Sequence, residues 1–511
     1  MQFKYTRIGF RSTIKAMEKK NLIISGNVVL FPFMAQGHLN PFLDLARILS
    51  SHLPPSIIIT IVSTPANILN LRPRFSSYPT IYFAELSFQN SIENTDSLSS
   101  LTAISHFYRS SEAFLRDPFH RLISEITQSN GGKPPLCIIS DMFLGFTVDV
   151  AHSFGSRHVP FYTSGPYAMS IYNSIWTHLP HFCVAGDDDD DVIPLPDLPH
   201  ITIRRNQLSN NMKAADPVKN PSSTFAKQQA EYCSRADGSL WNTVEILEKK
   251  SLDDWAKSSG KLVWAIGPLL PSSVQEYERG GKEPEVSPQM CTDWLNLQSP
   301  NSVLYVSFGS QNSIPFAQMM ELAKGLEQSE KPFIWMLRNP TGVDVNEEFK
   351  PEWLPEGFEQ RMKESRKGLI VRNWAPQIQI LSNKAIGAFL SHCGWNSVLE
   401  SLSRGVPIIA WPLGSEQYYN AKLLEEELGV CVEVARGFEA KIVGGEVALK
   451  VKEVLEGENG KQMRIKAEAL DGEMKKAVKG DSNGKGSSLK ALDDFVDALL
   501  KWGGMPLQDL P

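Results

Sequence analysis

Cysteine is scarce in this chain. Only six of its 511 residues are cysteines, and no two lie within four positions of each other. They are Cys137, Cys183, Cys233, Cys291, Cys393 and Cys431. This spacing excludes the short Cys-x2–4-Cys pairs of structural zinc sites, and the number is low for a disulfide-stabilised scaffold of this length. We therefore expect free, mostly buried thiols in a reducing compartment and a cytoplasmic location.

The chain also lacks a long hydrophobic run and an excess of basic charge. Its most apolar stretch, residues 22–34, is interrupted by Ser, Gly, Asn and Pro, whereas a transmembrane helix needs about 20 apolar residues. The formal net charge is −6, which offers no basic face for nucleic acid. We expect neither stable membrane insertion nor a nucleic-acid partner.

Acidic residues are absent from the first sixteen positions, which carry Lys4, Arg7, Arg11 and Lys15. A short organelle-targeting segment has this composition. Met17, however, begins M-E-K-K directly before the first expected strand, so we favour a disordered upstream extension over residues 1–16. No continuous apolar segment follows the basic residues, which argues against a secretory signal.

The length indicates more than one domain, because a single core stops growing at about 250–300 residues. Strand-like runs alternate with helical patterns in both halves, beginning with a strand near Asn27 and a helix capped by Asn40 with Pro41 behind it. This rhythm predicts parallel sheets. The fold class is therefore α/β, with two doubly wound Rossmann-like domains facing a cleft. The expected ranges are 17–270 and 291–480 for the domains, 271–290 for a linker and 481–511 for a C-terminal helical segment.

Five consecutive aspartates, residues 187–191, lie in an irregular, proline-rich region. A metal-binding acidic motif of the D-x-D type is one interpretation. We favour a solvated acidic loop, because no neighbouring strand would hold such ligands in place.

The most informative segment is S-H-C-G-W-N-S-V-L-E, residues 391–400. A strand is expected to end at His392 and a helix to begin at Asn396, so the segment is a strand-to-helix turn. Such a turn presents free backbone N–H groups and the positive end of a helix dipole, which suit a phosphate. A zinc site would need further ligands nearby, and adjacent strand residues point to opposite faces, which disfavours a Cys393–His392 nucleophile pair. A purely structural turn is the remaining alternative.

The flanking sequence closely resembles a known signature. The 44 residues from Trp374 to Gln417 resemble the secondary-product signature of plant family 1 UDP-glycosyltransferases. The resemblance extends to Q-G-H-L-N-P, N-T-V-E-I-L-E, I-G-P-L and S-V-L-Y-V-S-F-G-S and covers essentially the whole chain after Met17. It implies the GT-B fold, an N-terminal domain for the acceptor, a C-terminal domain for the UDP-sugar and a final helix that packs back on the N-terminal domain.

The resemblance also implies roles for individual residues. Trp374 would stack on the uracil, as aromatic side chains do on bases, and the backbone of Ala375 would bond to it. Gln377 and Glu400 would bind the ribose hydroxyls. The implied diphosphate ligands are His392, Asn396, Ser397 and Ser310, and the implied sugar contacts are Trp395, Glu416, Gln417 and Thr163.

Glu416 departs from the aspartate that much of the family has at this position. The carboxylate is retained one methylene further out, so sugar binding should survive. The combination of Gln417 and Trp395 resembles that in enzymes that use UDP-glucose. The signature lacks the arginine that is expected of some enzymes that use UDP-glucuronic acid.

His38 and Asp141 are the candidate catalytic residues. Each follows an expected strand of the N-terminal sheet, so parallel strands would bring both to one rim beside the cleft. A histidine with a pKa near 6.5 suits a general base, and a carboxylate on its second nitrogen fixes the tautomer. From the residues alone, a helix-capping histidine and an N-cap aspartate are the alternatives; the resemblance places the family's histidine–aspartate pair on these positions.

Together these features predict an inverting UDP-glucose-dependent O-glucosyltransferase that needs no metal or other cofactor and acts as a monomer. We expect a phenolic or flavonoid-like acceptor, with terpenoid or hormone alcohols second. A nucleotide-sugar-binding protein without catalysis is the alternative from another class. The expected acceptor contacts are His38, Met34, Phe143 and Ser415.

Overall fold

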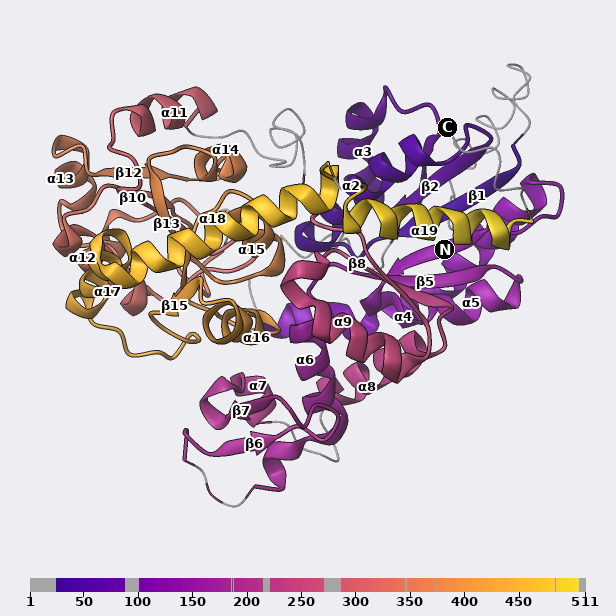
Figure 1. Cartoon of the computed structure of the whole chain (residues 1–511), viewed down its shortest axis with the longest axis horizontal. Helices are drawn as coiled ribbons and strands as arrows, with labels where there is room; N and C mark the ends of the chain where they lie inside the picture. Colours follow the sequence, from indigo (N-terminus) through magenta and orange to yellow (C-terminus); the bar gives the residue numbers. More distant parts are fainter. Residues whose placement is uncertain are drawn as a thin grey trace.

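Figure 1 shows the chain as a computed structural model. The structure describes residues 24–87, 101–184, 186, 188–214, 221–270, 286–344, 347–372, 374–482 and 484–504. The expected extension over 1–16 and most of the expected linker lie outside these residues.

The N-terminal half contains a parallel sheet of seven strands in the order β3-β2-β1-β4-β5-β8-β9. The strands are β1 (Gly26–Phe31), β2 (Ile57–Ser63), β3 (Ile81–Glu85), β4 (Cys137–Asp141), β5 (Arg157–Tyr162), β8 (Gly238–Trp241) and β9 (Leu262–Ala265). β1 pairs with β2 on one side and with β4 on the other. The strand order therefore reverses beside β1, where open α/β sheets bind ligands.

Helices cover both faces of this sheet. They are α2 (Gln36–His52), α3 (Pro65–Leu71), α4 (Leu101–Ser129), α5 (Thr147–Ser153), α6 (Pro166–His178), α8 (Pro221–Ser234) and α9 (Glu245–Ser259). The apolar side of α2 packs on Val28 and Leu30, whereas α4 packs on Val29 and Phe31 from the opposite face. This alternation along β1 follows from the two-residue period of a strand. An antiparallel pair, β6 (Val192–Pro194) and β7 (Thr202–Arg204), and the short α7 (Asn210–Lys213) extend from the domain.

The C-terminal half contains a second parallel sheet, of six strands in the order β12-β11-β10-β13-β14-β15. The strands are β10 (Val303–Ser307), β11 (Phe333–Met336), β12 (Gly368–Val371), β13 (Ile386–Ser391), β14 (Ile408–Ala410) and β15 (Cys431–Glu433). The helices are α11 (Pro288–Asn296), α12 (Phe316–Ser329), α13 (Phe358–Glu364), α14 (Gln377–Leu381), α15 (Trp395–Leu402), α16 (Gln417–Lys422), α17 (Gly444–Glu456), α18 (Glu458–Lys479) and α19 (Ser487–Trp502). The expected class, two doubly wound α/β domains, is confirmed.

The last helix returns to the N-terminal domain. Leu492, Phe495 and Leu499 of α19 are buried in the same core as α2 and β1, and Figure 1 shows α19 lying along that domain. The Oγ of Ser488 donates to the carbonyl of Gly267 over 2.5 Å. The expected return of the C-terminal segment is therefore observed.

Two expected boundaries differ from the structure. Residues 288–290, assigned to the linker, already belong to α11, because Ser287 caps its first turn by accepting from the N–H of Met290 over 3.2 Å. α2 begins at Gln36 instead of behind Asn40, so Pro41 lies inside the helix and His38 lies in its first turn.

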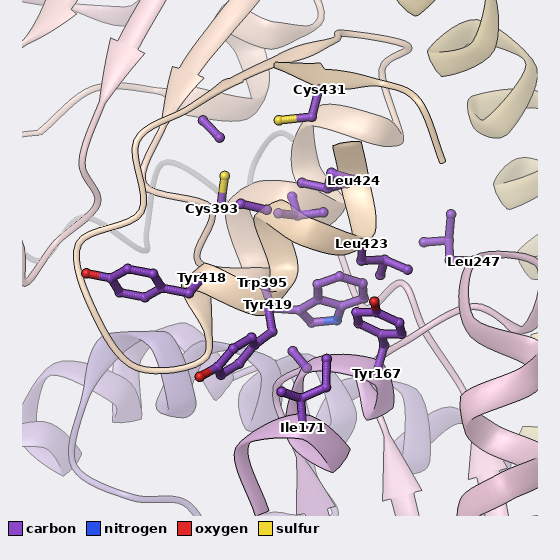
Figure 2. Close-up of a cluster of buried hydrophobic side chains, with 14 of the residues drawn as sticks. Tyr167, Ile171, Leu247, Cys393, Trp395, Tyr418, Tyr419, Leu423, Leu424 and Cys431 are labelled. Carbon is purple, nitrogen blue, oxygen red and sulfur yellow. The ribbon is translucent and has the colours of Figure 1, made fainter. Parts of the chain in front are cut away.

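A buried core joins the two domains. Figure 2 shows the indole of Trp395, from α15, lying among Tyr419 and Leu423 of the C-terminal domain and Tyr167 and Ile171 of α6. Apolar burial of this kind stabilises the interface in proportion to the area removed from water. The domains are thus packed against each other beneath the cleft.

All six cysteines are free thiols, and four of them are buried, as the sequence predicted. Among the described helices, none combines the length and apolarity needed to cross a membrane.

Candidate functional site

A cavity of about 960 Å³ lies between the domains at the carboxyl ends of both sheets. Fifteen of the seventeen expected site residues line it; the two that do not are Asp141 and Met34. Asp141 lies behind His38, which lines the cavity and contacts the Asp141 carboxylate. Met34 is 1 % exposed in the core beneath α4, so the expected acceptor contact of Met34 is wrong.

His38 and Asp141 form a close pair. The Nδ1 of His38 lies 2.7 Å from the Oδ2 of Asp141, and the carboxylate is fully buried at the end of β4. The other carboxylate oxygen accepts from the N–H of Phe143 over 3.0 Å. Because an ionised carboxylate only accepts, Nδ1 donates to it, and the lone pair of the neutral ring is left on Nε2. This is the tautomer that a general base requires.

The surroundings of His38 favour its protonated form. Burial lowers the pKa of His38, but the charge and hydrogen bond of Asp141, with a further contribution from the charge of Glu416, outweigh it. The pKa of His38 therefore lies above its usual 6.5. The Oγ1 of Thr163 lies 3.4 Å from the same ring nitrogen, Nδ1.

The turn between β13 and α15 has the form of an anion cradle. Cys393 adopts a positive φ of 61°, and Gly394 caps α15 without any side-chain hydrogen bond. The first N–H groups of the helix are thus left to a ligand. Cys393 itself is buried, and its carbonyl accepts from the amide of Asn420 over 2.9 Å.

The imidazole of His392 lies beside this turn, close to the backbone of Gly309 and Gly394. A Cβ on Gly309 would come within 2.8 Å of the imidazole, and one on Gly394 within 2.5 Å of Nε2. Gly309 also has a φ of +80°, which favours glycine. Burial lowers the pKa of His392 to about 4, so the ring is neutral at pH 7 in the free protein.

The expected ribose ligands lie next to each other. The Nε2 of Gln377 donates to the Oε2 of Glu400 over 2.6 Å, while its Oε1 accepts from the hydroxyl of Tyr305 over 3.2 Å. Gln377 also donates to Ser397 over 3.2 Å. The carboxylate of Glu400 is thereby held in a fixed position at the wall of the cavity.

The loop after β14 carries Glu416 and Gln417. The Oε1 of Gln417 accepts from the N–H groups of Leu413 and Gly414, over 3.0 and 3.2 Å. Ser415 has a positive φ of 54°. Burial raises the pKa of Glu416, an effect that its own backbone and the nearby His38 partly offset. The loop therefore faces His38 across the cleft.

The indole of Trp395, one of the implied sugar contacts, is buried. Its Nε1 donates to the backbone oxygen of Asn242 over 2.7 Å, and the side chain is only 2 % exposed. Trp395 still lines the cavity, but its ring packs into the interface between domains (Figure 2). The predicted contact of Trp395 with the sugar stays a prediction.

Many other residues that line the cavity were not foreseen, and three of them form recognisable parts of its wall. Tyr172 and Trp176 lie one turn apart on α6, with ring centroids 6.1 Å apart, and form part of the N-terminal wall. Their four-residue spacing was a readable signal, because such residues share a helix face. Arg338, which follows β11, donates to the backbone oxygen of Ser310 and supports that loop.

The aspartate run is paired with basic side chains. Within the described part of it, Asp189 pairs with Lys213, Asp190 with Arg204 and Asp191 with Arg205. Among the described residues, no three His, Cys, Asp or Glu side chains form a group that could hold a metal ion. The described residues 188–191 form a largely exposed turn, as favoured from the sequence.

Two Rossmann-like domains, a histidine–aspartate pair on one side of the cleft and an anion cradle on the other define a nucleotide-sugar-dependent transferase. The sequence profile described as "UDP-glucoronosyl and UDP-glucosyl transferase" matches residues 87–470. The chain belongs to this family, in its plant branch, and is a glycosyltransferase.

Individual relatives agree with this assignment. UDP-glycosyltransferase 92A1 of Arabidopsis thaliana is 39 % identical over 92 % of this chain and 96 % of its own length. Crocetin glucosyltransferase 3 of Crocus sativus is also 39 % identical, over 85 % of this chain and 91 % of its own. Among solved structures, UGT73P12 of Glycyrrhiza uralensis, complexed with glycyrrhetinic acid 3-O-monoglucuronide, has a TM-score of 0.77 at 28 % identity and covers 93 % of this chain and 96 % of its own. UGT71G1 of Medicago truncatula, complexed with UDP-glucose, has a TM-score of 0.76 at 25 % identity, over 93 % of this chain and 98 % of its own.

Proposed function

We propose that the chain transfers glucose from UDP-glucose to a hydroxyl group of a small phenolic or flavonoid-like acceptor, with inversion at the anomeric carbon. The observation that carries the proposal is the 2.7 Å pair of His38 and Asp141 beside the cavity, opposite the turn that begins α15. A base and an anion cradle that face one cavity suit an in-line displacement.

His38 would accept the proton of the acceptor hydroxyl on Nε2 as the oxygen attacks the anomeric carbon. The new C–O bond forms as the bond from that carbon to the β-phosphate oxygen breaks, and UDP leaves. Asp141 stabilises the imidazolium that results. Attack from the face opposite the leaving group gives a β-glucoside. General-base catalysis typically contributes about 10²–10⁴-fold.

The C-terminal domain would hold the donor. The uracil stacks on Trp374 against Ala375, the ribose bonds to Glu400 beside Gln377, and the diphosphate meets the first N–H groups of α15. His392, Asn396, Ser397 and Ser310 complete this cradle. Negative charge on the departing UDP is stabilised by preorganised donors, so no metal is required in this proposal. Glu416, Gln417, Thr163 and Trp395 would contact the sugar.

The test is to measure UDP release from UDP-glucose with a panel of phenols, flavonoids and terpenoid alcohols. Product NMR should show the β configuration, and UDP-galactose should be a poorer donor. Terpenoid or hormone alcohols are the second acceptor class. Binding of UDP-glucose without any release of UDP across the panel would favour a non-catalytic binding protein instead.

We propose further that the protein works as a monomer in the cytoplasm. Sedimentation of the purified chain and microscopy of a tagged copy test these two points.

A further inference from the structure

The part of the cavity formed by the N-terminal domain combines large apolar and aromatic side chains with uncharged polar ones. Its larger side chains are Met142, Phe143, Met169, Tyr172, Trp176 and Phe225. Among the described lining residues of this domain, Arg109 carries a fixed charge. The other side chains there that can titrate are His38, the tyrosines and a cysteine. A fixed positive charge in such a wall calls for a reason.

Arg109 has few partners of its own. The structure gives its guanidinium one hydrogen bond, a donation from one Nη to the Oγ of Ser222 over 3.2 Å. A guanidinium has five N–H donors. Two turns further along α4, Arg116 bonds instead to Glu112 over 2.7 Å, to Asp149 over 3.2 Å and to the hydroxyl of Tyr232 over 2.8 Å. Among the described carboxylates, none pairs with Arg109.

A short series of neighbouring side chains leads from Arg109 to His38, the proposed base. Ser222, its partner, lies one turn before Phe225 on α8. The ring of Phe225 lies 6.2 Å from that of Phe143, which in turn lies 5.3 Å from the imidazole of His38. Two aromatic rings therefore stand between Arg109 and His38 along the wall.

We propose that the acceptor carries an anionic group, a carboxylate in the simplest case, and that Arg109 binds it at the end of the acceptor remote from the attacked hydroxyl. This inference rests on the proposed function of the cavity. The planar fork of a guanidinium matches a carboxylate through two parallel hydrogen bonds. The aromatic wall between Arg109 and His38 suits a flat, apolar body that joins the two ends. Because the carboxylate is held away from His38, the product is a glucoside of the hydroxyl and not a glucose ester.

The experiment compares 4′-hydroxybiphenyl-4-carboxylate with its methyl ester, a pair that differs in charge at the end remote from the hydroxyl. Steady-state kinetics should give a kcat/KM about tenfold higher for the acid, the size expected of one charge-assisted hydrogen bond. Arg109→Gln should remove this preference through the KM of the acid and leave the ester unchanged. Arg109→Lys should retain part of it.

Arg121→Gln is the matched control, because Arg121 lies on the same helix, is exposed and does not line the cavity. Equal kcat/KM for acid and ester in the unaltered protein, or a preference that survives Arg109→Gln, would overturn the inference. Calorimetric binding of both compounds to the complex with UDP separates the two proposals. Arg109-dependent binding of the acid without any turnover would support the anion site and contradict the glucosyltransferase.

Discussion

The side-chain amide of Asn396 donates to the backbone oxygen of Gly37 across the cleft, over 2.8 Å. Gly37 precedes His38 in the first turn of α2, and its carbonyl would ordinarily accept from the N–H four residues later. That residue is Pro41, which has no N–H. The proline inside the helix thus frees the oxygen that Asn396 of the C-terminal domain binds. The turn that begins α15 is thereby tied to the helix that carries His38, the proposed base.

The hydrogen bond between Asn396 and Gly37 predicts that substitutions of Asn396 and Pro41 have coupled effects on activity. Asn396→Ala should lower kcat/KM by roughly fivefold or more, since one hydrogen bond contributes about 1 kcal/mol. Pro41→Ala should raise the melting temperature, because alanine restores the helical N–H to Gly37. In that background Asn396→Ala should cost less than it does alone. A double-mutant cycle in kcat/KM measures the difference, and strictly additive effects would contradict the coupling.

Asp141 should set the pH dependence of the reaction. His38 must be neutral to accept a proton, so the rate rises as pH passes upward through its pKa. Asp141 holds that pKa above 6.5. Asp141→Asn should therefore move the acid limb of the profile to lower pH, while the maximal kcat falls by about 10²-fold or more because the imidazolium loses its partner. UDP binding should be unchanged.

His178 and Asp197 provide the control for that experiment. They form a second histidine–aspartate pair, also 2.7 Å apart, that lies outside the cavity. Asp197→Asn should leave both the acid limb and kcat in place. An acid limb that does not respond to Asp141→Asn would show that another group titrates.

The positions of His38 and Asp141 were accessible from the sequence because parallel strands end at one rim, and their pairing is what the structure shows. The strand-to-helix turn at His392 was accessible for the same reason. Local signals were less reliable where tertiary contacts decide the outcome. Pro41 suggested a helix start at Asn40, whereas α2 begins at Gln36, since a helix tolerates a proline when another group satisfies the freed carbonyl.

The direction of a side chain was the second feature that the sequence did not predict. Trp395 and Met34 lie beside residues of the site, but their rings and chains turn into buried cores. Sequence spacing gives the element and the neighbours of a residue, and the side on which it is buried depends on tertiary packing: Met34 packs in its own domain and Trp395 against the other one. Arg109 shows the converse, because neither a motif nor a neighbouring carboxylate in sequence marks it as part of the cavity.

His392 should take up a proton when UDP-glucose binds. Its pKa is about 4 in the free protein, lowered by burial, and a diphosphate beside it favours the charged form. Between pH 4 and the raised value, binding should draw protons from the buffer. Calorimetry at pH 5.5, roughly the middle of that window, in buffers with different ionisation enthalpies measures the uptake. His392→Gln should abolish it, whereas His178→Gln should not.

Activity should not depend on a divalent metal. The described aspartates of the run pair with Lys213, Arg204 and Arg205, and the proposed leaving-group contacts are N–H groups. An excess of EDTA should leave the rate of UDP release unchanged, and substituting Asn for Asp189 and Asp190 together should do the same. A rate that falls with EDTA and returns with added Mg²⁺ or Mn²⁺ would contradict the proposed mechanism.

Trp395 should act on stability more than on the sugar. Trp395→Phe removes the donor to the buried oxygen of Asn242, and a buried acceptor left without a partner costs about 1–3 kcal/mol. The ring volume lost is a separate cost. Trp411→Phe carries the volume cost without the loss of a hydrogen bond, because the buried indole N–H of Trp411 has no hydrogen-bond partner in the structure. Denaturant unfolding should therefore show a larger loss for Trp395→Phe than for Trp411→Phe. The KM for UDP-glucose should change little, since the indole packs against α6 and α16. A selective rise in that KM with unchanged stability would show instead that the ring contacts the sugar.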